Sequence, residues 1–203
     1  STGYAFLAAK VYRGKSSRSF KNDEIYQQGR VIMDRRSARA FRKKTKWGRH
    51  VQSQNWASSE YETMNLLYDA GADIPRPIAY SGNAILMEYV GAGESAAPML
   101  REITLGAEEA RGVFGSIMGN IELFLAENLV HADLSAFNIL YWDRGIQIID
   151  FPQSVDARFN PNAYSLLERD IANVELYFSK CGIRVDSSGL AMRLWSRFQQ
   201  ARL

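Results

Sequence analysis

Cysteine is almost absent from this sequence, which contains only Cys181 among its 203 residues. A single cysteine cannot form an internal disulfide, so a disulfide-stapled fold is excluded and a reducing cytosol is favoured. Apolar runs approaching the roughly 20 residues of a membrane-spanning helix are also missing. The N-terminal sequence STGYAFLAAK lacks the charged-then-apolar order of a signal peptide. We therefore expect a cytoplasmic protein with no membrane segment.

The composition is typical of a globular protein. Hydrophobic residues make up 46% of the chain, which is enough for a substantial core in one domain or in two small lobes around a cleft. The sequence shows no internal repeat and no low-complexity segment. Its function must therefore be sought in local motifs.

Positive charge is concentrated in one stretch, although the net charge is only +3. The stretch from Arg30 to Arg49 contains many Lys and Arg residues and only one acidic residue, Asp34. Two interpretations stay open for this basic cluster: a solvated helix face or loop, or a docking surface for RNA or another polyanion.

The apolar patterns predict a mixed α and β chain. The run YAFLAAKVYR is rich in strand formers, and one charge, Lys10, interrupts its buried-looking pattern. The other expected elements are a helix from about Glu60 to Ala70 capped by Ser58 and Ser59, a strand in NAILMEYVG, a hinge loop from Gly91 to Ala97, a helix over about Glu108–Glu127, a helix through Leu167–Phe178, and a helix over about Ser188–Gln200. Gly112, Gly115 and Gly119 predict a small-residue surface on the long helix against which other elements pack.

The stretch VHADLSAFNILYWDRGIQIID places polar groups among apolar residues from Val130 to Asp150. Its second half predicts two short strands joined by a turn at residues 143–145. Because a hairpin brings its two ends together, Asn138 before the first strand and Asp150 after the second can face one site. Asp133 lies five residues before Asn138 in the same loop.

These three side chains suit phosphoryl transfer from ATP. Mg²⁺ prefers oxygen ligands, which Asn138 and Asp150 offer, and a carboxylate such as Asp133 can orient the attacking hydroxyl and accept its proton. The order and spacing match the general protein-kinase template. The alternative, that Asp133 and Asn138 only make local turn hydrogen bonds, is common for each residue alone. We expect His131 to organise the loop rather than to carry the proton.

Lys10 also needs a partner, because an unpaired lysine in a buried strand is costly unless its side chain reaches the surface. ATP phosphates and a carboxylate would provide partners. Glu60 is the favoured carboxylate because it shares a helix face with Met64 and Leu67. It could instead be an acid that only favours the helix dipole, and Glu62 is the rival partner.

A family resemblance emerges from the order of several motifs. AAKVYR, the helix ending in IPRPI, ILMEYVG, HADLSAFNILY, IIDFPQSVD and LLERDIANV follow one another as in RIO-family atypical serine/threonine protein kinases. The resemblance covers roughly residues 4–180, and its most specific element is IIDFPQSVD, where Pro152 replaces the Gly of the usual Asp-Phe-Gly. It implies an α+β, trimmed two-lobed protein-kinase-like fold. Its N-lobe, residues 1–90, would be small and β-rich, its C-lobe, residues 91–203, mainly helical, and the ATP cleft would lie between them.

The resemblance also implies roles for individual residues. It assigns Lys10 to the α- and β-phosphates, Glu60 to Lys10, Met87 to the gatekeeper position, the backbone of Glu88 and Val90 to adenine, Asp133 to the catalytic base, and Asn138 and Asp150 to Mg²⁺. The implied cofactors are ATP and Mg²⁺, with Mn²⁺ as a substitute.

The sequence departs from the family pattern at two points. The family carries a phosphate-covering loop of the Ser-Gly-Lys-Glu-Ala type before the lysine strand, whereas STGYAFLAAK starts at that strand. We therefore expect the N-lobe to be incomplete and the sequence to be a fragment or an N-terminally trimmed chain. Ala132 stands where the family often has Gly.

Three functions remain in view at this point. The first is an ATP- and Mg²⁺-dependent RIO-type kinase acting on Ser or Thr hydroxyls or on itself. The second is an ATPase-type nucleotide switch in maturation of the small ribosomal subunit, which the resemblance implies. In this case the basic cluster from Arg30 to Arg49 would contact ribosomal RNA or a pre-ribosomal particle. The third is a small-molecule phosphotransferase of the aminoglycoside or choline kinase type, which would need a larger acceptor-binding helical region after Asp150.

Overall fold

The computed structural model describes residues 6–12 and 46–203, with side chains in the second range from residue 56 onward. The predicted RNA contact through Arg30 to Arg49 lies outside the described side chains. The strands are β1 (Leu7–Val11), β2 (Pro77–Ser81), β3 (Ala84–Glu88), β4 (Gly91–Ala92), β5 (Ser95–Ala96), β6 (Leu129–Val130), β7 (Ile139–Trp142), β8 (Gly145–Ile148) and β9 (Val155–Asp156). The helices are α3 (Lys46–Asp69), α4 (Ala107–Ala126), α5 (Ala163–Phe178) and α6 (Ser187–Gln199), with short 3₁₀ turns at η1 (Leu100–Glu102) and η2 (Ser179–Cys181).

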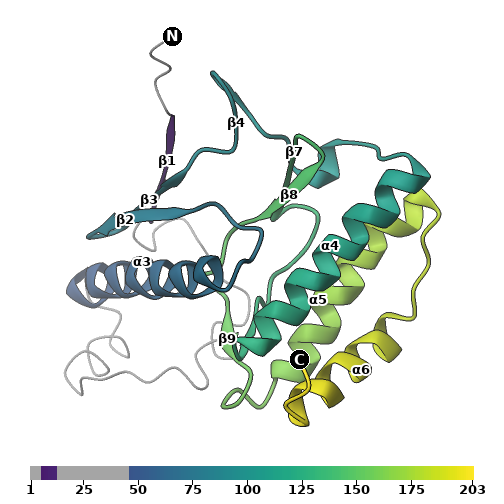
Figure 1. The fold of residues 1–203 in the computed structure, drawn as a ribbon. Coiled ribbons are helices and arrows are strands. Elements are labelled where there is room, and N and C mark those ends of the chain that lie inside the picture. Colours follow the sequence, from purple (N-terminus) through teal and green to yellow (C-terminus); the bar gives the residue numbers. More distant parts are fainter. Residues whose placement is uncertain (1–5, 13–45) are drawn as a thin grey trace.

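The N-terminal part is a three-stranded antiparallel sheet with strand order β1-β3-β2, and α3 packs against β2 and β3 (Figure 1). Strand β1 pairs with β3 so that Lys10 lies opposite Ile85. The sequence predicts a buried-looking β1, but Leu7 and Val11 are 49% and 58% exposed. Side chains alternate between the two faces of a strand, and Lys10 lies on the face opposite to these two residues.

Helix α3 is much longer than the sequence pattern indicates, because it begins at Lys46 and not near Glu60. The predicted caps, Ser58 and Ser59, lie inside the helix, where Ser58 Oγ donates to Glu62 Oε1 at 3.2 Å. The C-terminal end agrees with the prediction. Gly71 adopts the left-handed conformation with φ of 89°, and the following N–H of Ala72 donates to Leu67 O, as in a glycine-terminated helix.

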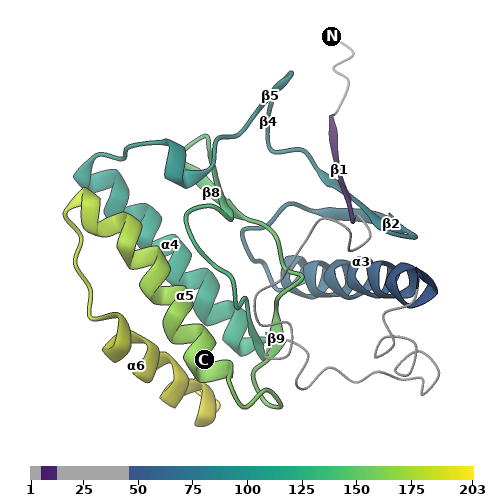
Figure 2. The same cartoon turned by 180° about the vertical axis from the view of Figure 1, so that it is seen from behind.

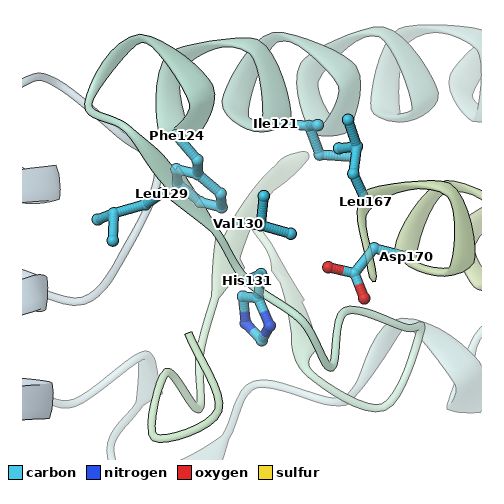
Figure 3. Close-up of a pocket in the computed structure, with 7 residues that line it drawn as sticks. All are labelled: Ile121, Phe124, Leu129, Val130, His131, Leu167 and Asp170. Atoms are coloured by element: carbon cyan, nitrogen blue, oxygen red, sulfur yellow. The ribbon is translucent and has the colours of Figure 1, made fainter. Parts of the chain in front are cut away.

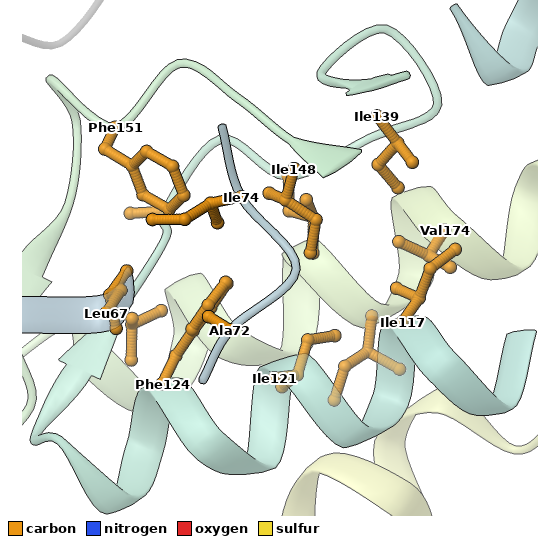
Figure 4. Packing of buried hydrophobic residues seen from close by; sticks show 14 of the residues in the cluster. Leu67, Ala72, Ile74, Ile117, Ile121, Phe124, Ile139, Ile148, Phe151 and Val174 are labelled. Atoms are coloured by element: carbon orange, nitrogen blue, oxygen red, sulfur yellow. The ribbon is translucent and has the colours of Figure 1, made fainter. Parts of the chain in front are cut away.

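The C-terminal part is mainly helical, as predicted. Helices α4 and α5 lie side by side, and α6 packs against both (Figure 2). One apolar cluster runs through the described chain. Figure 4 shows Leu67, Ile74 and Phe151 near Phe124 of α4, and Ile117 of α4 near Val174 of α5. The core is thus continuous from the end of α3 to α5, which fixes the two parts of the chain together. None of the described helices has the length and apolar content needed to cross a membrane.

The hairpin predicted after Asn138 is present as β7 and β8, with Trp142 opposite Gly145. Its two turn residues, Asp143 and Arg144, both have positive φ, 47° and 63°, which is the geometry of a type I′ hairpin turn. Gly145 was expected in the turn but belongs to β8. A smaller hairpin, β4–β5, occupies the predicted hinge at Gly91 to Ala97.

The glycines of α4 do not form the predicted packing surface. Gly112, Gly115 and Gly119 are exposed, and a Cβ added at any of them would meet no atom within 4 Å. The helix instead buries the opposite face, which includes Val113, Ile117 and Phe124. The prediction was wrong because the larger apolar residues, with more surface to bury, determine the buried side.

The segment after α3 is tied to the C-terminal part by a buried amide. Asn120 of α4 is 5% exposed, and its Oδ1 accepts from the Asp73 N–H at 2.8 Å while its Nδ2 donates to Asp73 Oδ2 at 2.7 Å. The carbonyl of Asp73 accepts from the Ile148 N–H of β8 at 2.8 Å. One residue, Asp73, therefore joins the end of α3 to α4 and to the strand that leads into Asp150.

We predict that Asn120→Asp lowers the free energy of unfolding by about 2–3 kcal/mol, because it places a second carboxylate against Asp73 and removes the amide donor. Adding Asp73→Asn should restore part of this loss, since the exchanged pair can again form an amide-to-carboxylate hydrogen bond. The Ser116 carbonyl, which accepts from Asn120 Nδ2 at 2.9 Å, stays without its donor in both variants. Urea unfolding of the two single variants and the double variant measures the coupling. Strictly additive losses in the double variant would contradict a direct Asp73–Asn120 interaction.

Candidate active site

Lys10, Glu60 and Asp150 meet at one point although they lie far apart in the sequence. Lys10 Nζ donates to Glu60 Oε1 at 2.6 Å and to Asp150 Oδ1 at 2.5 Å. The Lys10 and Asp150 side chains are 24% and 38% exposed, whereas that of Glu60 is 1% exposed. The site therefore has one buried carboxylate and one carboxylate that solvent and ligands can reach.

Glu60 is stabilised in its buried position by three donors. Besides Lys10, the N–H of Phe151 donates to Glu60 Oε1 at 2.9 Å, and Tyr12 Oη donates to Glu60 Oε2. A buried carboxylate is tolerated when its oxygens are paired and hydrogen-bonded in this way. The rival Glu62 bonds Ser58 on the surface of α3, so the geometry places Glu60 with Lys10, as the sequence predicted.

Asp133 and Asn138 are also brought together near Asp150. Asn138 Nδ2 donates to the carbonyl of Asp133 at 2.8 Å, and the Asn138 carbonyl accepts from the N–H of Ile149 at 2.9 Å, one residue before Asp150. Desolvation and, next, the negative charge of Asp150 raise the pKa of the Asp133 carboxyl above its ordinary value. A carboxylate with a raised pKa is a better proton acceptor.

The loop that carries Asp133 is bound to α5 through its backbone. The Asp170 carboxylate accepts from the N–H groups of Ala132 and Leu134 at 2.7 and 3.0 Å. Arg169 Nη2 donates to the Ala132 carbonyl, and Asn173 Nδ2 donates to the Leu134 carbonyl at 3.2 Å. The backbones of both neighbours of Asp133, Ala132 and Leu134, are therefore held by hydrogen bonds to side chains of α5.

Ala132 has a φ of 64°, a left-handed conformation that glycine adopts without strain. Alanine stands here where the resemblance implies glycine, so this chain carries a backbone strain that glycine would avoid. In this chain the strained conformation is held by the bonds from Arg169 and to Asp170.

His131 is buried at 3% exposure and orients the same loop, as predicted. Its Nε2 lies 3.2 Å from the Ile149 carbonyl, and its Nδ1 accepts from the Asp133 N–H at 3.3 Å. These contacts require the neutral tautomer with the hydrogen on Nε2, because an imidazolium has no acceptor. Burial is the main cause that lowers the pKa of His131 to about 4.

A small cavity lies behind His131, with space for about one water molecule. Figure 3 shows His131 and Asp170 at one side of it and Ile121, Phe124 and Leu167 on the others. Burial is also the main cause that raises the pKa of Asp170 to about 7, against the two backbone hydrogen bonds that lower it. The cavity is lined by two residues that hold the Asp133 loop in place, His131 and Asp170, and it lies on the core side of that loop.

The residues that the resemblance assigns to the gatekeeper position, Met87, and to adenine, Glu88 and Val90, lie at the end of β3 and just beyond it. Met87 is 9% exposed and pairs with Ala8 and Pro77 on either side. The Glu88 N–H donates to the Arg76 carbonyl, and the Val90 carbonyl accepts from Ala97. A role in adenine binding would therefore fall to the carbonyl of Glu88 and the N–H of Val90.

Sequence reasoning missed two kinds of residue. Tyr12 belongs to the motif AAKVYR and donates to Glu60, but no role was predicted for it from the sequence. Arg169, Asp170 and Asn173 lay inside LLERDIANV, where their spacing at one helix face was the available signal. Nothing in the sequence identified the loop backbone as their target.

We predict that His131→Asn reduces the acid sensitivity of the fold. The folded-state pKa of His131, about 4, lies below the ordinary value of 6.5, so the unfolded chain alone takes up the proton as the pH falls from 6.5 to 4 and stability is lost in that window. Urea unfolding of both proteins at several pH values measures this. The free energy of unfolding should fall less for the variant than for the parent protein, and equal slopes would contradict a buried neutral His131.

Comparisons with known proteins agree with this geometry. The family model of the RIO domain matches residues 2–189. The RIO-type serine/threonine-protein kinase Rio1 of Thermoplasma acidophilum is 31% identical over 185 residues, which cover 91% of both chains. Serine/threonine-protein kinase RIO1 of Saccharomyces cerevisiae is 31% identical over 89% of this chain but only 36% of its own length.

Among solved structures, the Rio2 kinase of Chaetomium thermophilum, in a complex described as ADP/Mg²⁺-phosphoaspartate, superimposes with a TM-score of 0.61. It is 24% identical, and the match covers 86% of this chain and 56% of that chain. This likeness supports the predicted trimmed kinase-like α+β fold. The family match over nearly the whole sequence shows that this chain belongs to the RIO family of serine/threonine protein kinases.

Proposed function

We propose that this chain transfers the γ-phosphoryl group of ATP to a Ser or Thr hydroxyl of a protein, or to itself. The observation that carries the proposal is the position of Lys10 Nζ, which bonds the buried Glu60 and the accessible Asp150 at the same time. A cation held between a structural carboxylate and a ligand-accessible carboxylate is positioned to receive phosphate oxygens. The relatives reported above are named serine/threonine protein kinases.

Lys10 would orient the α- and β-phosphates while Glu60 keeps its ammonium in place. Glu60 retains the Phe151 N–H and Tyr12 Oη as donors, so it stays fixed when Lys10 turns from Asp150 towards a nucleotide. Such preorganisation is how a kinase lowers its barrier, because the chemistry depends mostly on position and charge.

Asp133 would act on the acceptor. Asp133 is an exposed residue of the loop, and the backbone on either side of it is fixed by Asp170. The acceptor hydroxyl would donate its hydrogen bond to Asp133. The raised pKa of the Asp133 carboxyl favours uptake of the proton as the hydroxyl oxygen bonds the γ-phosphorus, the bond from the γ-phosphorus to the bridging oxygen breaks and ADP leaves.

Asn138 and Asp150 fit a magnesium ion by the chemistry of their donors. Asn138 Nδ2 bonds the Asp133 carbonyl, which leaves its Oδ1 as the group for a cation, and the Asp150 carboxylate is accessible. The described residues contain no group of three or more His, Cys, Asp or Glu side chains that could hold a metal, and Mg²⁺ is usually bound by one or two carboxylates plus phosphates and water. When bound, Mg²⁺ would neutralise the phosphate charge.

The relatives do not favour the two alternative functions. Their names indicate protein kinases and not small-molecule phosphotransferases, and a nucleotide switch that contacts RNA depends on Arg30 to Arg49, outside the described side chains. The RNA partner, a role in ribosome maturation, the use of Mn²⁺, the cytoplasmic location and the lobe boundary at residues 90 and 91 stay predictions from the sequence.

We predict that Asp150→Asn reduces Mg²⁺-dependent ADP formation by about 100-fold or more, because it removes the charged metal ligand. Asparagine tolerates the left-handed conformation of residue 150, whose φ is 74°, so the fold should be retained. Asp143→Asn is the matched control, since Asp143 also has positive φ, 47°, at the far end of β8. A folded Asp150→Asn protein with full turnover would contradict the metal assignment, as would an equal loss in the control.

A further inference from the structure

Phe137 is exposed in a loop whose other apolar residues are buried. Its side chain is 56% exposed, whereas Leu134, Ala136 and Ile139 are between 0% and 7% exposed. The loop therefore directs one large aromatic ring to solvent only four residues after Asp133. An exposed ring at a site that must receive another molecule is a candidate contact surface.

The position of this ring is fixed close to the base. The Phe137 N–H donates to Ser135 Oγ at 3.3 Å, and the Asn138 N–H donates to the Ser135 carbonyl at 2.9 Å. Asn138 Nδ2 then bonds back to the Asp133 carbonyl. Because the bond from Asn138 to Asp133 closes the loop, Phe137 belongs to the same short closed loop as the residue that would accept the proton.

Arg101 places a positive charge on the same surface. Its guanidinium carbon lies 4.3 Å from the centre of the Phe137 ring, and the backbone N–H of Arg101 donates to the Ala136 carbonyl at 3.1 Å. The adjacent Glu102 turns its carboxylate to the Met99 N–H. Within the described part of the chain, no carboxylate forms an ion pair with Arg101.

We propose that Phe137 and Arg101 form an acceptor platform that binds a polypeptide segment with an acidic side chain near its Ser or Thr. The inference rests on the proposed function, because the base needs a hydroxyl delivered to it. The ring offers an apolar contact, and the guanidinium, which pairs with no carboxylate of the described residues, offers a charge that a carboxylate complements. A polypeptide is favoured over RNA because this platform carries one arginine, whereas nucleic-acid sites use several cations along a phosphate backbone.

The platform can be tested with two synthetic peptides that contain the same single Ser, flanked by Asp in one and by Lys in the other. The parent protein should transfer phosphate to the Asp peptide with a kcat/KM about five-fold higher. Arg101→Glu should reverse the preference, and Phe137→Ala should lower kcat/KM for both peptides. Peptide-free ADP formation and the KM for ATP should not change in either variant.

Arg193→Glu is the matched control, because Arg193 is exposed on α6 and the substitution gives the same change in net charge. Helix α6 lies away from the β7–β8 hairpin (Figure 1). The proposal is overturned if the parent protein does not distinguish the peptides, or if Arg101→Glu keeps the original preference while losing affinity for poly-uridylate RNA. ADP formation with no labelling of either peptide would overturn the platform and leave the ATP chemistry standing. Absence of ADP formation by the parent protein would instead refute the proposed function.

Discussion

The site depends on one buried carboxylate. Glu60 is almost without solvent exposure, so its charge must be balanced inside the protein, and the balance comes from Lys10, Tyr12 and the N–H of Phe151. These donors belong to β1, to the residue that follows it and to the residue that follows Asp150. A displaced donor would leave a buried charge unpaired, which is costly. Electrostatic compensation therefore brings distant parts of the chain into one arrangement.

The remaining structure supports that arrangement from the C-terminal side. Asp170 fixes the backbone on both sides of Asp133, and His131 joins the same loop to the residue before Asp150. Asp73 connects the end of α3 to α4 and β8. Glu60, Asp133 and Asp150 thus depend on a shared network of buried hydrogen bonds, which can hold reacting groups in place without help from a ligand.

Much of the site could be predicted from the sequence because its residues follow a local order. Asp133, Asn138 and Asp150 lie within one loop and hairpin, so short-range geometry brings them together. The pairing of Lys10 with Glu60 could be predicted because a lysine in a buried strand needs a carboxylate partner, and Glu60 shares a helix face with apolar residues. The start of α3, the exposed glycines of α4 and the roles of Tyr12 and Asp170 could not be predicted. Each depends on tertiary packing or on backbone groups that carry no sequence signal.

A structure of this chain with Mg²⁺ and a non-hydrolysable ATP analogue would test the central claim most directly. The account predicts that Lys10 Nζ leaves Asp150, binds α- and β-phosphate oxygens and keeps its bond to Glu60. Asp150 and Asn138 Oδ1 should then be ligands of the metal. A nucleotide and metal bound elsewhere, with Lys10 still bonded to Asp150, would contradict the account.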